Sequence, residues 1–205
     1  MCAGYTDIGL DAGHRQGGYM LKTLRENLKV LSQNPADPYP AIIKRLAGKR
    51  DAACFEEPLR RLILAMPYMI AQLQNWAEES GLPSRHRLLR GFALAYLNHP
   101  EDVMPERGVG LFGYLDDAYL IARVYHLTMQ EPDWSGQRYH IDDEDLARNI
   151  PAWLGLARRL APKETARIDD LIEDVSRGRE DAISAALTKS TRPSRAVMRL
   201  ARSCA

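Results

Sequence analysis

Apolar residues recur at steps of three and four through most of the chain, which is the spacing of one face of an α-helix. From Gly17 the pattern runs to Asn34-Pro35, where proline ends it. A short helix is expected over 41–48. A longer one is expected to begin at Glu57-Pro58, with proline in its first turn, and to continue to Ala77.

The second half of the chain has the same periodicity. Two apolar helices are expected over 85–98, with Ser84 as the cap, and 116–130. Asp142 is placed to cap a further helix, Pro151 and Pro162 are each expected to begin another, and a last one covers about 180–187. No segment alternates with the period of two that marks a strand. We therefore predict one all-α domain, a multi-helix bundle, made of N-terminal helices (17–83), a core (84–130), C-terminal helices (141–188) and a basic tail (189–205).

Prolines, glycines and acids concentrate between the two central helices, in the stretch HPEDVMPERGVGLFGYLDD. One interpretation is structural. Asp102 caps the turn between Pro100 and Pro105, while Asp116 and Asp117 lie at the start of the next helix, where negative charge meets the positive end of the helix dipole. On this interpretation the turn makes the two central helices antiparallel, and its unusual residues serve folding.

The other interpretation is functional. A short turn between antiparallel helices would bring together the carboxylates of Asp102, Glu106, Asp116 and Asp117. Carboxylate oxygens suit Mg²⁺, Mn²⁺ or Ca²⁺, so this hypothesis makes the protein a divalent-metal-dependent hydrolase. No other cofactor is indicated, because the chain lacks a phosphate-binding glycine loop followed by Lys-Ser or Lys-Thr.

The run YLNHPEDVMPE followed by GYLDDAYLI resembles the signature of the YkvA-like family, a bacterial domain of unknown function, within residues 96–121. The resemblance implies a small helical domain and supplies no established reaction. Glu106 stands where that family usually has aspartate, and Met104 stands where it has isoleucine. The matching positions are Tyr96, Leu97, Pro100, Asp102, Pro105, Gly113, Asp116 and Asp117.

The C-terminal segment from Thr188 to Ala205 carries only basic charges. Arg195, Arg199 and Arg202 fall on one face of a possible amphipathic helix. Such a helix could bind a protein partner, an anionic membrane surface or nucleic acid. The alternative is a tail whose few apolar residues pack on the protein's own core.

The composition narrows the function only slightly. With 28 basic and 27 acidic residues the net charge is +1, so attraction to a polyanion must come from local patches. The N-terminal stretch has no continuous apolar core and the three cysteines form no disulfide framework, so we expect a cytoplasmic protein. Asp169-Asp170 is interpreted as a solvated pair or a helix cap. Our preferred hypothesis is a non-catalytic helical interaction or regulatory module with a protein partner, and homo-oligomers are compatible with it.

Overall fold

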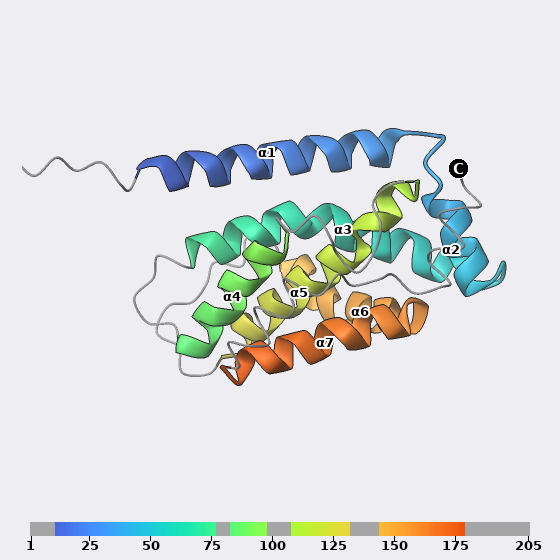
Figure 1. Cartoon of the computed structure of the whole chain (residues 1–205). Helices are drawn as coiled ribbons and strands as arrows, with labels where there is room; N and C mark the ends of the chain where they lie inside the picture. The colour runs from blue at the N-terminus through green and yellow to red at the C-terminus, as the bar shows by residue number, and fades with distance from the viewer. Residues whose placement is uncertain (1–10, 77–82, 98–107, 132–143, 179–205) are drawn as a thin grey trace, which may run out of the picture.

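The computed structural model describes residues 11–76, 83–97, 108–131 and 144–178. These residues form seven α-helices and one 3-10 helix, and they include no strand, so the prediction of an all-α bundle is confirmed (Figure 1). No helix among these residues is both long and apolar enough to cross a membrane. The elements are α1 (Asp11–Gln33), α2 (Tyr39–Ala47), α3 (Ala52–Asn75), α4 (Ser84–Tyr96), η1 (Gly110–Tyr114), α5 (Leu115–Met129), α6 (Glu144–Leu160) and α7 (Pro162–Ser176).

Helix α5 forms the central axis of the bundle. It is buried on all sides, since Ala118, Leu120, Ile121, Ala122 and Val124 are each 0% exposed although they point in different directions around the helix. A helix that is apolar all round must be enclosed by its neighbours. Helices α3, α4, α6 and α7 pack against α5, and α1 lies on the outside of α3 (Figure 1).

The two central helices run antiparallel, as the sequence predicts. His86 in the first turn of α4 contacts Glu131, two residues beyond the end of α5. The end of α3 packs on the same pair of helices, because the Trp76 ring stacks on Tyr125 with ring centroids 5.1 Å apart. Arg90 of α4 donates from Nη1 to the carbonyl oxygen of Leu73 at 3.3 Å. These contacts fix one end of the α3–α4–α5 core.

Three predicted helix starts are wrong. Helix α1 begins at Asp11 rather than Gly17, and α3 begins at Ala52 rather than Glu57, which places Pro58 inside the helix. Pro151 does not begin a helix, because it lies within the continuous helix α6. Its own side chain is exposed, while a buried stripe continues past it on the other face, so burial of that stripe outweighs the lost backbone hydrogen bond. The stripe consists of Leu146, Ile150, Leu154 and Ala157.

The predicted start of α7 at Pro162 is confirmed, and Gly178 follows its end with the left-handed φ of +70° that favours glycine. The predicted helix over 180–187 and the basic tail lie outside the described residues. The same holds for the proline-bounded part of the acidic turn, residues 98–107.

A carboxylate fastens the turn before α2 to the start of η1. Asp37 accepts the backbone N–H of Tyr39 on Oδ1 at 2.8 Å and the N–H of Leu111 on Oδ2 at 3.0 Å. Gly110, with φ of +56°, allows this approach, because a Cβ atom there would lie 2.3 Å from Asp37 Oδ2. The chain can therefore enter α5 on this path only with glycine at position 110.

Gly110→Ala is expected to lower the free energy of unfolding by about 2 kcal/mol or more, because alanine disfavours a positive φ and its methyl group meets Asp37. Urea denaturation measures this. Gly91→Ala in α4 is the matched control: nothing lies within 4 Å of the added Cβ, so it should stabilise by about 0.5–1 kcal/mol. Equal effects of the two substitutions on the free energy of unfolding would contradict the requirement for glycine at position 110.

Candidate functional site

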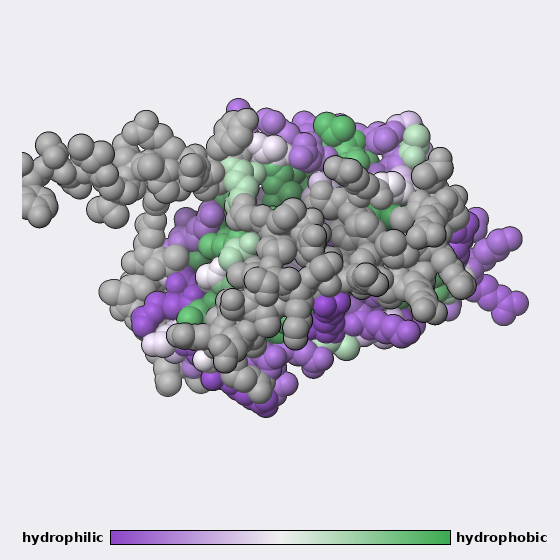
Figure 2. Space-filling view, viewed as in Figure 1, coloured by the Kyte–Doolittle hydropathy of each residue, from purple (hydrophilic) through white to green (hydrophobic). Residues whose placement is uncertain are grey.

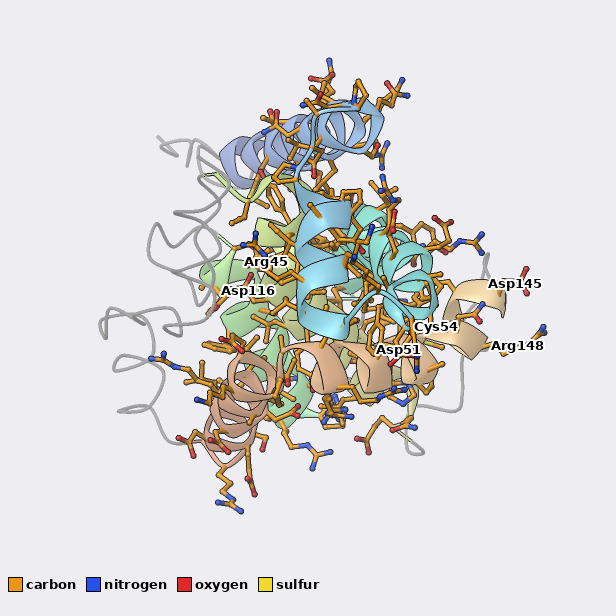
Figure 3. All side chains as sticks on the ribbon, turned by 90° about the vertical axis from the view of Figure 1, so that its right-hand side faces the viewer. Arg45, Asp51, Cys54, Asp116, Asp145 and Arg148 are labelled. Atoms are coloured by element: carbon orange, nitrogen blue, oxygen red, sulfur yellow. The ribbon has the colours of Figure 1, made fainter. Side chains whose placement is uncertain are left out.

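The first candidate is the acidic start of α5. Asp116 and Asp117 occupy the first turn of this helix, as predicted, and their side chains are 1% and 4% exposed. Burying a carboxylate costs free energy unless nearby positive charge or hydrogen bonds compensate. The positive end of the α5 dipole provides part of that compensation. Figure 3 shows Arg45, from the last turn of α2, on the same side of the molecule as Asp116.

The other two predicted ligands, Asp102 and Glu106, lie outside the described residues. Over the ranges that the structure describes, no group of three or more histidine, cysteine, aspartate or glutamate side chains is arranged to hold a metal ion. Two of the four predicted carboxylates are thus brought together in one helical turn. The convergence of all four stays a prediction, as does the partner-binding role of Arg195, Arg199 and Arg202, which also lie outside the described residues.

A second cluster, which the sequence analysis missed, surrounds Asp169 of α7. Its carboxylate accepts the hydroxyl of Tyr119 at 2.8 Å and Nε of Arg123 at 2.9 Å, both from α5. Arg158 of α6 donates from Nε to the same carboxylate at 3.1 Å, and its guanidinium lies 5.6 Å from the Tyr119 ring centroid. One carboxylate therefore holds three helices together, and we call these four residues the Asp169 cluster.

The electrostatics of the Asp169 cluster favour the ionised carboxylate. Partial burial, the largest single influence, raises the pKa of Asp169, but the hydrogen bonds from Arg158, Tyr119 and Arg123 together outweigh it, so the pKa lies below its usual value. The pKa of the Tyr119 hydroxyl is raised, first by burial and then by its bond to Asp169. At neutral pH the cluster is thus a phenol and two guanidinium groups donating to one carboxylate.

The interpretation of Asp169-Asp170 as a solvated pair is therefore wrong for Asp169 and holds for Asp170, which is exposed. Asp169 lies at the edge of the buried face of α7 that contains Thr165, Ile168 and Ile172. That position beside an apolar stripe was the available signal. The sequence could not identify its two partners on α5, because they lie 46 and 50 residues away, and its third partner, Arg158, lies on the preceding helix.

A third group joins the start of α4 to the residue after α5. The His86 side chain is 0% exposed, and its Nε2 lies 2.5 Å from Oε2 of Glu131. Arg85 Nη2 approaches the same oxygen at 3.5 Å. The partner Glu131 was not predicted.

These three groups differ in the chemistry open to them. Both oxygens of Asp169 already accept charged or phenolic donors, and Glu131 accepts from His86, so a metal ion would first have to displace protein donors. Asp116 and Asp117 lie in the first turn of α5, and each also makes an interaction within the protein. The predicted metal site combines these two aspartates with Asp102 and Glu106, which lie outside the described residues.

Asp169→Asn is expected to lower the free energy of unfolding by about 2 kcal/mol, because it removes the charge that three donors share. Since the folded-state pKa of Asp169 is depressed, its stabilising contribution is present above about pH 4 and is lost as pH falls through the folded value. Urea denaturation should show the two proteins converging in stability below about pH 4. Asp170→Asn is the neighbouring control and should change stability by less than about 0.5 kcal/mol. A constant gap at all pH values would contradict the assigned role.

One comparison with known proteins gives a match. Residues 86–122 match the model of a family described as a protein of unknown function, DUF1232. The matched segment runs from the buried His86 of α4 to Ala122 of α5 and includes Asp116 and Asp117. No match to the chain was found among curated proteins or among solved structures. The central pair of antiparallel helices, with the acidic turn between them, is thus the part of the chain that matches the DUF1232 family of unknown function.

Proposed function

We propose that the protein is a non-catalytic helical module that works by binding a protein partner. The observation that carries this proposal is that charged side chains of the described bundle bind to other segments of the same chain and hold the helices together. Asp169, Asp37 and the pair His86 and Glu131 each fasten two or more segments of the described bundle. Groups fixed in this way would make the bundle a rigid support that presents a surface to the partner.

The contact region of this module is expected in the basic tail. Arg195, Arg199 and Arg202 fall on one helical face with no acidic residue between Thr188 and Ala205. Guanidinium groups form paired hydrogen bonds with carboxylates, so an acidic protein surface is the partner chemistry that fits them. The rigid bundle would then position the tail.

The partner test compares three forms of the full chain as bait in quantitative capture. The triple variant Arg195→Gln, Arg199→Gln, Arg202→Gln should lose a partner that the unchanged chain captures, and the loss should be reproduced by raised salt. The control variant Arg61→Gln, Arg148→Gln, Arg177→Gln removes the same charge from exposed arginines on the bundle and should keep the partner. Equal capture by all three baits would contradict the proposed contact region.

A divalent-metal-dependent hydrolase is the second candidate function. It is favoured by the near-complete burial of two consecutive carboxylates, Asp116 and Asp117, in the first turn of α5. With Asp102 and Glu106, these side chains would supply hard oxygen ligands for Mg²⁺ or Mn²⁺. The metal would act there as a Lewis acid or would activate a water molecule.

Melting temperature in the presence of Mg²⁺ or Mn²⁺ separates the two candidates. The interaction module predicts no change on adding either ion, because a ligand shifts the unfolding equilibrium only by binding the folded state. A rise that is lost in Asp116→Asn and Asp117→Asn and kept in Asp145→Asn, an exposed control, would instead establish the metal site. Glu106→Gln provides a further variant at the predicted site if the buried aspartate variants fail to fold.

A further inference from the structure

Exposed positive charge gathers at one end of the molecule. Helix α2 ends there, the turn from α2 leads into α3 there, and the junction of α6 and α7 lies at the same end (Figure 1). Figure 3 views this end directly, with Arg45 and Asp51 labelled on it. We call the following exposed residues the cationic end: Lys44, Lys49, Arg50, Arg159 and Lys163.

Packing between the helices brings these residues together. Arg159 of α6 lies over the ring of Phe55 in the first turn of α3, with its guanidinium carbon 5.1 Å from the ring centroid. Lys49 and Arg50 immediately precede that turn, and α7 begins with Pro162 and Lys163 after the end of α6. Figure 2 shows hydrophilic side chains projecting at this end. The cluster is therefore a product of the fold as well as of the run KRLAGKR.

The charge of the cationic end is not neutralised by the part of the chain that the structure describes. None of its five residues forms a salt bridge there. The acids that follow in α3 are engaged elsewhere, since Glu56 pairs with Arg60 and Glu57 pairs with Arg61. Asp51 is exposed and offsets one charge. Five exposed cations beside the exposed Asp51, in a chain whose net charge is +1, form a local surplus of positive charge.

We propose that the cationic end docks the protein on an anionic lipid surface. Clustered lysine and arginine side chains are attracted to acidic headgroups, and each adds to the attraction within a Debye length of about 8–10 Å. The exposed large apolar residues of the described chain, Val30, Leu64 and Leu88, are not part of this end. Docking is therefore electrostatic and reversible, without insertion into the hydrocarbon.

The surface favours lipid over nucleic acid for two reasons. Among the described residues at this end, Tyr39 and Phe55 are buried, so neither ring is available for stacking on bases. The cations also come from three separate segments at a helix-bundle end, and no single helix carries them as a row that could enter a groove. This proposal concerns a surface different from the tail and does not depend on the proposed protein partner.

Vesicle sedimentation of the full chain tests the proposal. The unchanged chain should bind vesicles containing about 30% phosphatidylserine, fail to bind pure phosphatidylcholine vesicles, and be released as salt is raised. The variant Lys44→Gln, Lys49→Gln, Arg50→Gln should bind about tenfold or more weakly. All these positions are exposed, so the variant should fold, which its melting temperature checks. The tail arginines stay unchanged in both proteins.

The matched control is Lys22→Gln, Arg25→Gln, Arg177→Gln, which removes the same charge from exposed positions on α1 and after α7. It should retain vesicle binding. Binding that weakens equally in the control would overturn the proposal in favour of a net-charge effect. Unchanged binding by the Lys44, Lys49 and Arg50 variant, no binding by the parent chain, or preferential binding of a DNA duplex at the same salt would overturn it as well.

Discussion

The fold depends on one constraint, the enclosure of α5 on every side. An apolar helix in that position must satisfy its few polar groups inside the protein. Thr128 does so within the helix, by donating to the Val124 carbonyl oxygen at 2.8 Å. Tyr119 does so across helices, through the Asp169 carboxylate. The charged groups around α5 therefore hold neighbouring helices to it. The contact between His86 and Glu131 does the same for the antiparallel pair α4 and α5.

This arrangement separates two kinds of charge. Acidic and basic side chains next to α5 are paired across helices, as in the Asp169 cluster. Charged side chains at helix ends, such as Lys44 at the end of α2, are instead exposed to solvent. The cationic end is the clearest case, since none of its five residues forms a salt bridge with another described residue. Asp116 and Asp117 at the start of α5 are buried as well, and each has an interaction within the protein. With Asp102 and Glu106 they make up the predicted metal site.

Much of the architecture was predictable because helical periodicity reports which residues face a core. The antiparallel central helices and the start of α7 at Pro162 follow from that pattern with proline and glycine as boundaries. The predicted helix start at Pro151 is wrong, because a proline marks a helix start only when no buried stripe continues past it. Asp169 and Asp37 could not be assigned, since each also binds a residue far along the chain: Arg123 lies 46 residues from Asp169, and Leu111 lies 74 residues from Asp37. Helical periodicity depends only on neighbouring residues, so it cannot predict contacts between distant segments.

Native-state hydrogen exchange tests the central role of α5 most directly. If α5 is the enclosed axis, the backbone amides of Leu120 to Val124 should exchange only through global unfolding, with an opening free energy equal to that from urea denaturation. Amides of the outer helix α1 should exchange through smaller, local openings. Exchange of the α5 amides by local opening, as fast as or faster than those of α1, would contradict the account.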